Sequence, residues 1–244
     1  MNRVPRFVVG ASALNGDRAR VSGTELHHMR DVMRLKAGDR ISLLVANGSE
    51  FDGQLIAYET ACALVEIHSR EKSRRRARLI LAAATIKGPR MDFMVEKAAE
   101  LGADELWPLL CARGVARNPG SERRARWDRL ALAATKQSLR ADAMIVAQPC
   151  DVGTMTARLP SCTLALMCMA GARPIAAIVR AARPSAILIT CGPEGDFDFA
   201  EQAAMRAAGF VPAGLGINRL RSETAALAAL GQISGALHEL DKEN

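Results

Sequence analysis

Several common protein classes are excluded by what the sequence lacks. The 244-residue chain contains no run of about 18 apolar residues, so no membrane-spanning helix and no membrane partner are predicted. Its N-terminus lacks the apolar segment of a secretory signal, and we therefore expect a cytoplasmic protein. None of the six cysteines forms a Cys-x-x-Cys pair, and only four histidines accompany them, so neither a metal site nor a disulfide framework is expected.

The glycine motifs of the common nucleotide-binding folds are also missing. The sequence has no P-loop and no Gly-x-Gly-x-x-Gly after a strand, which argues against a Rossmann dehydrogenase or methyltransferase. Gly214-Leu215-Gly216 comes closest, but the third glycine is absent. Pro149-Cys150 is similar to the nucleophile of enzymes that methylate pyrimidine carbon, yet a dipeptide carries little weight beside the more frequent buried or turn cysteine.

The positive charge of the chain is unevenly distributed. The formal net charge is +7, but the residues from Thr190 onward hold four Lys or Arg against eight Asp or Glu, a net of −4. The preceding residues hold 29 against 18, a net of +11. Such a basic part predicts a surface that faces a polyanion, and a merely solubilising surface charge explains the composition equally well.

Residues 1 to 70 are predicted to form a small β-rich domain. Runs of strand character lie at residues 7–9, 20–21, 41–45, 51–58 and 63–67. Asn47-Gly48 predicts a hairpin, and one helix is expected over residues 24–33. A small barrel with these elements is a common RNA-binding shape. The six basic residues within 70–78 are interpreted either as a solvated linker or as a phosphate contact.

Beyond residue 78 the pattern is typical of an α/β fold with a parallel sheet, because strand-length apolar runs alternate with amphipathic stretches. Strands are expected at residues 79–85, 104–110, 143–147, 164–169, 186–191 and near 211, and helices at 91–101, from 121, at 174–182, at 199–208 and from 222. The helix from Ser121 should bury Trp127 and expose Arg123, Arg124, Arg126 and Arg129. The last helix repeats apolar residues at Leu227, Leu230, Ile233, Leu237 and Leu240, a stripe that fits either core or a dimer interface.

Two glycine-bearing loops, each after an apolar run, predict a ligand site. The first is Gly192-Pro193-Glu194-Gly195, and the second spans residues 215–226. In the second loop, Ser222-Glu223-Thr224 predicts the start of a helix, with a capping hydroxyl and an acid in the first turn. Loops of this kind can meet at one edge of a sheet and enclose a small molecule.

These loops are part of a wider pattern. It includes Arg6-Phe7-Val8, residues 28–39, Lys87, Met91-Asp92, Lys97, Glu100-Leu101-Gly102, Trp127, Gln137-Ser138 and Arg140. Together with the loops, these residues resemble the SPOUT methyltransferases, and among them the bacterial 16S ribosomal RNA (uracil-N3) methyltransferases. The resemblance extends over nearly the whole chain.

The resemblance implies a fold, a reaction and partners. A PUA-like RNA-binding β-barrel is expected over residues 1–72 and a SPOUT domain with a trefoil knot over residues 73–244. The cofactor would be S-adenosylmethionine, bound in the knot across a homodimer interface, to which the apolar stripe of the last helix is then assigned. The substrate would be N3 of a uridine in 16S rRNA within an assembled small ribosomal subunit. No metal is implied.

The resemblance also assigns roles to residues. Cofactor contacts are expected from Thr190, Gly192, Pro193, Glu194, Gly195, Leu215, Gly216, Leu220, Arg221, Ser222 and Thr224. RNA contacts, mainly to phosphates, are expected from Arg6, Arg30, Arg34, Lys87, Lys97, Arg113, Gln137 and Arg140. Arg221 would stabilise the negative charge on uracil as N3 loses its proton, with a structural pair to Glu194 or Glu223 as the alternative. Glu194 and Glu223 are candidates for the base, and either could instead be an anchor.

The chain departs from the family pattern at three positions. Asp196 follows Gly195 where a second glycine is usual, Lys136 replaces an acid before Gln137, and Gly114 follows Arg113 in place of serine. Two further hypotheses therefore stay open. One is a SPOUT enzyme that acts on another RNA or on the ribose 2′-oxygen. The other, motivated by Asp196, is a non-catalytic RNA-binding assembly factor.

Overall fold

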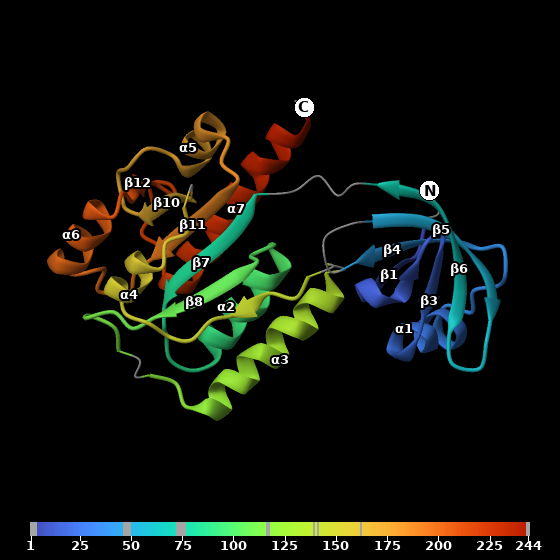
Figure 1. Cartoon of the computed structure of the whole chain (residues 1–244). Coiled ribbons are helices and arrows are strands. Elements are labelled where there is room, and N and C mark those ends of the chain that lie inside the picture. Colours follow the sequence, from blue (N-terminus) through green and yellow to red (C-terminus); the bar gives the residue numbers. More distant parts are fainter. Residues whose placement is uncertain are drawn as a thin grey trace. The chain divides into compact units, whose positions relative to one another are not determined.

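The structure is a computed structural model in which the chain forms two compact units. The description covers residues 4–45, 50–71, 77–115, 118–138, 140, 142–161 and 163–242. One unit comprises residues 1–75 with 135–142, and the other comprises residues 76–134 with 143–244 (Figure 1). The two units are described separately below.

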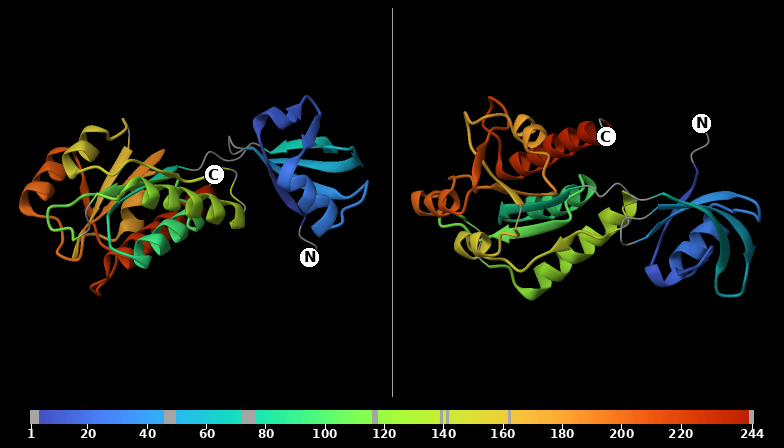
Figure 2. Two further views of the ribbon diagram at one scale, coloured as in Figure 1. Left: turned by 90° about the horizontal axis from the view of Figure 1, so that it is seen from below. Right: turned by 45° about the horizontal axis from the view of Figure 1, so that its top comes forward.

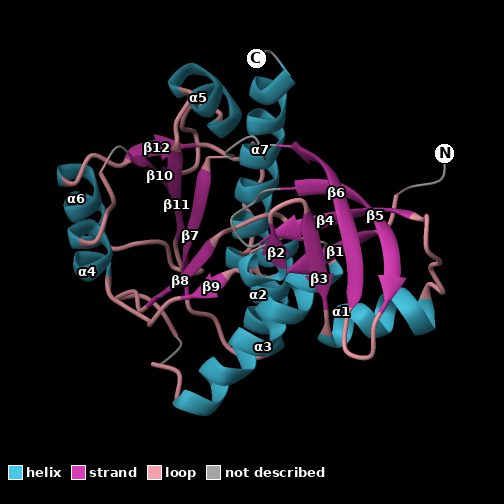
Figure 3. Ribbon diagram, turned by 45° about the vertical axis from the view of Figure 1, so that its right-hand side comes forward, coloured by secondary structure: helices cyan, strands magenta, loops and turns pink. Residues whose placement is uncertain are grey.

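The N-terminal unit is built on a six-stranded sheet. Its elements are β1 (Arg6–Val9), η1 (Ala11–Ala13), β2 (Leu14–Asn15), β3 (Arg18–Val21), α1 (Gly23–His27), the π-helical turn η2 (His28–Val32), β4 (Arg40–Val45), β5 (Glu50–Tyr58) and β6 (Ala63–Glu71). The strand order is β1-β4-β5-β6-β3-β2, in which β1 runs parallel to β4 and every other pair is antiparallel (Figure 3).

Alternation of side chains gives this sheet one buried face. In β1, Phe7 and Val9 are buried, and in β3 the same is true of Ala19 and Val21. Met29 from η2 joins their cluster and is fully buried. The antiparallel pairing of β4 with β5 agrees with the predicted hairpin, although Asn47-Gly48 itself lies outside the described residues.

The C-terminal unit alternates strands and helices. Its elements are β7 (Arg78–Ala84), α2 (Pro89–Glu100), β8 (Glu105–Leu109), α3 (Ser121–Gln137), β9 (Ile145–Val146), α4 (Val152–Ala157), β10 (Thr163–Cys168), α5 (Ile175–Ala182), β11 (Ala186–Cys191), α6 (Phe199–Ala207), β12 (Val211–Ala213) and α7 (Ser222–Lys242). The six strands are all parallel, in the order β12-β10-β11-β7-β8-β9. The predicted parallel α/β sheet is thus confirmed.

Helices cover both faces of this sheet. Residues of α2, α3, α5 and α7 share one buried cluster with Leu79 and Leu81 of β7, whereas α4 and α6 share another with Ile80 and Ala82 of the same strand. Figures 1 and 2 show α6 and α7 on opposite sides of the strands. Successive residues of a strand point to opposite faces, so an uninterrupted apolar run such as β7 is expected in a sheet that is covered on both sides.

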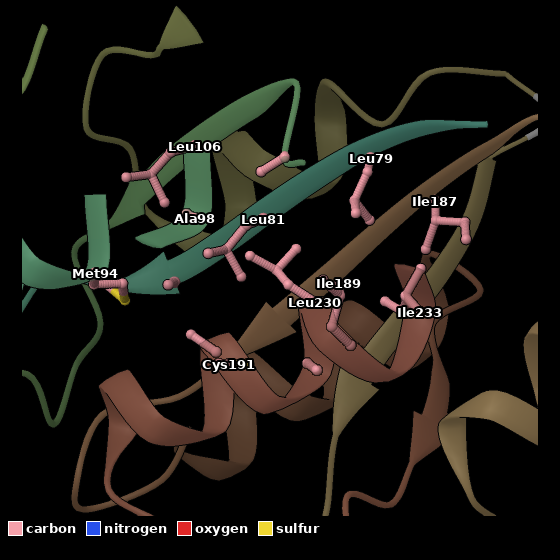
Figure 4. Packing of buried hydrophobic residues seen from close by; sticks show 14 of the residues in the cluster. Leu79, Leu81, Met94, Ala98, Leu106, Ile187, Ile189, Cys191, Leu230 and Ile233 are labelled. Carbon is pink, nitrogen blue, oxygen red and sulfur yellow. The ribbon is translucent and has the colours of Figure 1, made fainter. Parts of the chain in front are cut away.

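The stripe of the last helix belongs to the core of the chain. Leu230, Ile233 and Leu237 pack with the strands β7 and β11, whose side chains point toward α7 in Figure 4. Leu240 is also buried, and Leu227 is half-buried. The assignment of this stripe to a dimer interface was therefore wrong, because α7 fills the space between α2, α5 and the sheet.

The order of elements deviates from the sequence prediction at a few points. The helix α4 was not predicted, and the expected strand at 143–147 is reduced to the two residues of β9. The helix expected over 24–33 is divided into α1 and the π-helical turn η2. Within the described residues, no helix is long and apolar enough to cross a membrane.

Candidate functional site

A cavity of about 610 Å³ lies where three neighbouring parallel strands end. Its walls come from the loops that follow β10, β11 and β12. The lining residues are Cys168, Met169, Ala170, Gly171, Cys191, Gly192, Pro193, Glu194, Asp196, Leu215, Gly216, Ile217, Asn218, Arg219, Leu220, Ser222 and Ala225. The carboxyl ends of parallel strands are the usual place for a ligand in such folds, and the volume fits a small organic molecule.

The first wall is the tight loop between β11 and α6. The Asp196 amide donates to the Pro193 carbonyl over 2.9 Å, which closes a turn. Asp196 itself has a φ of 60°, a left-handed conformation that aspartate tolerates better than most residues. Its carboxylate accepts from the Phe197 amide at 2.7 Å. Gly192 is closely packed, since a Cβ there would lie 3.2 Å from the Phe197 backbone nitrogen and the loop would have to shift slightly to accept it.

A capping box ends this loop and ties it to a neighbouring segment. The Asp198 carboxylate accepts from the Glu201 amide at 2.7 Å, and the Glu201 carboxylate accepts from the Asp198 amide at 2.9 Å. Glu201 also accepts from the Ala112 amide at 2.8 Å. Next to it, Arg113 donates to the Gly195 carbonyl at 3.1 Å. The first wall is consequently stabilised both by hydrogen bonds within its own loop and by hydrogen bonds to the segment at Ala112 and Arg113.

The second wall is the longer loop between β12 and α7. At Gly214 a Cβ would lie only 2.4 Å from the Ala172 carbonyl oxygen, so only glycine fits. The Gly214 carbonyl accepts from the Ile175 amide at 3.0 Å, and the Leu215 carbonyl accepts from the Gln232 side chain at 2.9 Å. Gly216 has a φ of 142°, which also favours glycine. The loop is therefore anchored to both α5 and α7.

Arg90, at the start of α2, connects the two walls. Its guanidinium donates to the Glu194 carboxylate at 2.7 Å and lies 3.7 Å from the Glu223 carboxylate. A second arginine, Arg219 in the second wall, donates to the Glu194 backbone carbonyl at 3.2 Å. The hydrogen bond and charge of Arg90, with a smaller contribution from Arg221, lower the pKa of the Glu194 carboxyl. The lowered pKa makes the Glu194 carboxylate a weaker proton acceptor than an unpaired glutamate, which favours an anchoring role over that of a base.

Buried polar atoms without a hydrogen-bond partner gather at this site. Thr190 Oγ1, Ser222 Oγ and Glu223 Oε2 are each buried and make no hydrogen bond among the described residues, although Glu223 keeps its longer ionic contact with Arg90. Buried polar groups are almost always paired in folded proteins, so each unpaired atom needs an explanation. A ligand with donors and acceptors in the cavity would provide one.

The structure brings together seven of the eleven residues expected to contact the cofactor. Gly192, Pro193, Glu194, Leu215, Gly216, Leu220 and Ser222 line the cavity. Four expected residues do not line it. Thr190 is fully buried behind it, Gly195 contacts Arg113, and Arg221 and Thr224 are exposed. Sequence reasoning missed Arg90 and the wall contributed by the loop after β10, at residues 168–171.

The eight residues expected to contact RNA are in different local environments. Arg6 pairs with Glu50 at 3.0 Å and Arg30 with Asp31 at 3.2 Å. Lys97 is held by Glu96 and Glu100, each at 2.7 Å. The remaining positions are Arg34, exposed with a φ of 53°, Lys87 and Gln137, both exposed, Arg113, bound to Gly195, and Arg140, half-buried. Lys87 stands apart because it lines a second cavity.

Neither Cys111 nor Cys150 has the environment of a nucleophilic thiolate. Burial raises the pKa of the Cys150 thiol and raises that of Cys111 to about 12, so neither is a thiolate at neutral pH. Cys168 and Cys191 lie in the cavity wall with their sulfurs 3.2 Å apart. Within the described part of the chain, no group of three or more potential metal ligands occurs.

Comparison with known proteins identifies the family. A family model described as an RNA methyltransferase domain matches residues 73–234, which include the whole cavity. The chain belongs to this RNA methyltransferase family. A second model, described as an RNA methyltransferase PUA domain, matches residues 21–58 of this RNA methyltransferase.

Relatives of this RNA methyltransferase resemble it over most of its length. A ribosomal RNA small subunit methyltransferase E of Synechocystis sp. is 30% identical over 238 residues, covering 95% of this chain and 78% of that protein. The Bacillus subtilis protein of the same name is 29% identical and covers 88% of both chains. A crystal structure of a ribosomal RNA small subunit methyltransferase E from Neisseria gonorrhoeae, bound to S-adenosyl methionine, matches with a TM-score of 0.71 at 27% identity over 96% of this chain and 98% of that chain.

Proposed function

We propose that this protein transfers a methyl group from S-adenosylmethionine to N3 of a uridine in 16S rRNA. The observation that carries the proposal is the cavity at the ends of β10, β11 and β12, with the unpaired Ser222 hydroxyl in its wall, in a chain of the RNA methyltransferase family. The names of the relatives support small-subunit rRNA as the substrate, and the Neisseria structure supports the cofactor.

The residues of the cavity fit this cofactor. Leu215 and Leu220 offer apolar contacts for the adenine, and the backbones of Gly192 and Gly216 allow a close approach. The unpaired Ser222 hydroxyl would gain a hydrogen bond to the ligand. When bound, S-adenosylmethionine supplies an electrophilic methyl group attached to a sulfonium. The two walls hold the ligand, and Arg90 holds the walls together.

Arg221 is the residue that we assign to the uracil. Loss of the N3 proton spreads negative charge onto O2 and O4, and a guanidinium beside these oxygens stabilises it. Arg221 is exposed and, as far as the chain is described, has no carboxylate within 4.0 Å. Glu194 and Glu223 both form their ionic contacts with Arg90 and not with Arg221. This leaves the Arg221 guanidinium available to substrate.

The two acids differ in what they can do. The lowered pKa of Glu194, caused by Arg90, makes it a poor acceptor for the N3 proton, so we assign it an anchoring role. Glu223 is 9% exposed, and its Oε2 makes no hydrogen bond among the described residues but only the 3.7 Å ionic contact with Arg90, so we assign proton transfer to Glu223. Positioning of N3 against the methyl group would provide a further large share of the rate.

The assembly and topology form part of the same proposal. We propose a trefoil knot in residues 73–244, supported by the contacts of α7 with both β7 and β11 in the centre of the sheet. A PUA-like β-barrel over residues 1–72 and an assembled small subunit as the substrate follow from the family resemblance, as does a cytoplasmic location. A homodimer is supported by apolar side chains that a single chain leaves exposed, among them Phe93 at 49% and Ile217 at 101%.

Asp196 does not favour the non-catalytic alternative. Its carboxylate accepts the Phe197 amide within the loop, and its left-handed backbone reproduces the conformation that glycine would adopt. The residue therefore completes the first wall and does not block it. We accordingly expect S-adenosylmethionine to bind.

Nucleoside analysis tests the proposed reaction. The purified protein is incubated with small ribosomal subunits from a strain that lacks the enzyme and with methyl-labelled S-adenosylmethionine. Digestion and mass spectrometry should then find the label in 3-methyluridine. Label in a ribose would indicate a 2′-oxygen methyltransferase instead, and no label despite cofactor binding would contradict the proposed substrate. A crystal structure with S-adenosylhomocysteine tests the cofactor contacts and the knot.

A further inference from the structure

A second cavity of the C-terminal unit, called here the α3 groove, has a volume of about 930 Å³, and its charged lining residues are mainly cations. Its walls are Lys87, Gly88, Val115, Asn118, Pro119, Gly120, Glu122, Arg123, Arg126 and Arg129. Four of these residues are basic and one is acidic, and none of them was assigned to RNA before except Lys87. The charge of the groove is opposite to that of a polynucleotide backbone.

The arginines are held in place by the packing of α3. Trp127 is fully buried and donates from Nε1 to the Asp92 carboxylate of α2 at 3.2 Å, which fixes the rotation of α3 about its axis. With the helix in this orientation, Arg123, Arg126 and Arg129 are exposed. They follow at three-residue spacing, a rise of about 4.5 Å per step along the helix.

Most of the positive charge in the α3 groove is not neutralised by the protein. Arg126 is paired with Asp92 at 2.8 Å. Among the described residues, Lys87, Arg123 and Arg129 have no carboxylate within 4.0 Å. Exposed cations without internal partners are the groups that replace counterions on a phosphate backbone.

The α3 groove and the cofactor cavity flank the same turn. Lys87 and Gly88 line the groove, and Arg90, two residues later, contacts Glu194 and Glu223 at the cofactor cavity. A strand whose target base enters the cavity would thus continue along the arginine side of α3. The groove contains no aromatic side chain for stacking a base, so its chemistry suits phosphates rather than base edges.

We propose that the α3 groove binds the phosphate backbone of the substrate RNA beside the target nucleotide, with Lys87, Arg123 and Arg129 as the phosphate contacts. The proposal rests on the proposed function, because it takes RNA as the substrate. It extends Lys87, an RNA contact implied by the family resemblance, to a surface with Arg123 and Arg129, which neither the resemblance nor the relatives identify. Its function is to hold the strand in register with the cofactor cavity.

Salt-dependent binding tests the proposal with the full-length protein. In vitro transcribed 16S rRNA is titrated by filter binding at several KCl concentrations, with the wild type, an Arg123→Gln/Arg129→Gln variant and an Arg158→Gln/Arg173→Gln control. The control removes two exposed arginines that lie outside both cavities. Each lost phosphate contact should reduce the slope of log affinity against log salt by about 0.7 and the affinity at 0.1 M salt by about fivefold.

The outcomes separate this proposal from the proposed function. The groove variant should lose slope and affinity while calorimetry gives unchanged S-adenosylmethionine binding, and the control should match the wild type. If the groove variant kept the salt slope and the affinity of the wild type, the α3 groove proposal would be overturned while the proposed function would stand. Equal losses in the control variant would have the same consequence. A change of sedimentation mass without a change of slope would assign the groove to contacts between copies and also overturn it. Wild-type protein that neither binds nor methylates 16S rRNA would overturn both proposals.

Discussion

The cofactor cavity and the α3 groove lie on either side of one turn but differ in kind. The cavity is made of glycines, small apolar residues and buried hydroxyls, with its charges paired across the walls by Arg90. The α3 groove is made of exposed arginines, of which Arg123 and Arg129 have no acidic partner among the described residues. The cavity suits one small molecule of defined shape, whereas the α3 groove suits the repeated phosphate charges of a polynucleotide strand.

This difference predicts two kinds of mutational behaviour. Changes in the cavity should act through fit and through contacts shielded from solvent, so their effects should depend little on salt. Changes in the groove should act through counterion release, so their effects should vary with salt. Five predictions test this division, in order of decreasing effect.

Arg221 is an exposed cation that we assign to catalysis, and its replacement should give the largest effect. Replacement by alanine should lower the turnover number about 100-fold, the loss expected when a group that stabilises transition-state charge is removed. The affinity for S-adenosylmethionine should change little, because Arg221 does not line the cavity. Single-turnover kinetics and calorimetry measure the two quantities. Equal losses in both, or full activity, would reject the assigned role.

Gly214 tests the shape of the cavity. A Gly214→Ala change places a Cβ against the Ala172 carbonyl, which must move the second wall at a cost of about 1–3 kcal/mol in the free energy of unfolding. Cofactor affinity should fall along with it, equally at low and high salt. Denaturation and calorimetry provide the measurements.

Gly235 provides the matched control for this change. It lies in α7, where a Cβ would meet no atom within 4 Å. Gly235→Ala should stabilise the protein by about 0.5–1 kcal/mol, because alanine is the better helix former. If Gly214→Ala and Gly235→Ala had the same stability and the same cofactor affinity, close packing at Gly214 would not determine the shape of the second wall.

Arg90 tests whether paired charge supports the cavity. Arg90→Met removes the partner of Glu194 and Glu223, and we expect cofactor affinity to fall about tenfold, the order of one hydrogen bond to a charged group. Glu194→Gln is the comparison, since it removes only the Glu194 half of the contact. If both variants bind the cofactor as tightly as the wild type, the bridge does not organise the site.

The same ion pair predicts a pH dependence. Because Arg90 lowers the pKa of Glu194 in the folded state, this carboxylate stabilises the fold above its unfolded pKa of about 4.3. The contribution is lost as pH falls through the lower folded value. The wild type should therefore be more stable than Glu194→Gln at neutral pH and should lose stability more steeply below this pH, so that the two proteins converge in acid. Denaturant unfolding across the pH range measures both.

Lys97 should give the smallest effect. It was expected to contact RNA, but Glu96 and Glu100 already hold its ammonium group, which leaves less charge to offer a phosphate. Lys97→Gln should change the salt slope of 16S rRNA binding by only about 0.2, against about 0.7 for a lost phosphate contact. If Lys97→Gln instead reduced the slope by about 0.7, paired and unpaired cations would contribute equally to RNA binding on this surface.

Local patterns were sufficient to predict most of the C-terminal architecture. The apolar runs at β7 and β11 have residues buried on both faces, as a covered parallel sheet requires. Trp127 and Met94 lie in the core at positions indicated by helical spacing. The two loops were also identifiable, because glycine and proline after an apolar run mark a turn whatever the tertiary structure.

Other features depend on contacts that the sequence does not reveal. The strand order β12-β10-β11-β7-β8-β9 is set by crossovers, and the interior strands are too similar in composition to rank. Arg90 was missed because its partners Glu194 and Glu223 are more than one hundred residues away. The stripe of α7 was misassigned because a buried helix and a dimer helix show the same apolar spacing.

The helix α4 was missed for a local reason. It has only six residues, which is too short for a convincing period. Its start was nevertheless marked, since Asp151 accepts from the Thr154 amide at 2.7 Å and acts as the N-cap. An acid directly before a possible first turn, followed by the apolar Val152 and Met155, was the signal available.

The two edges of the parallel sheet constrain how copies of the protein can associate. The strand β12 has three residues, and Pro212 at its centre has no amide hydrogen to donate, while β9 at the other edge has two residues. Neither edge presents a row of free peptide groups long enough to recruit a strand from another chain. Any dimer that this unit forms must then use helices and loops, and its parallel sheet is protected from edge-to-edge aggregation.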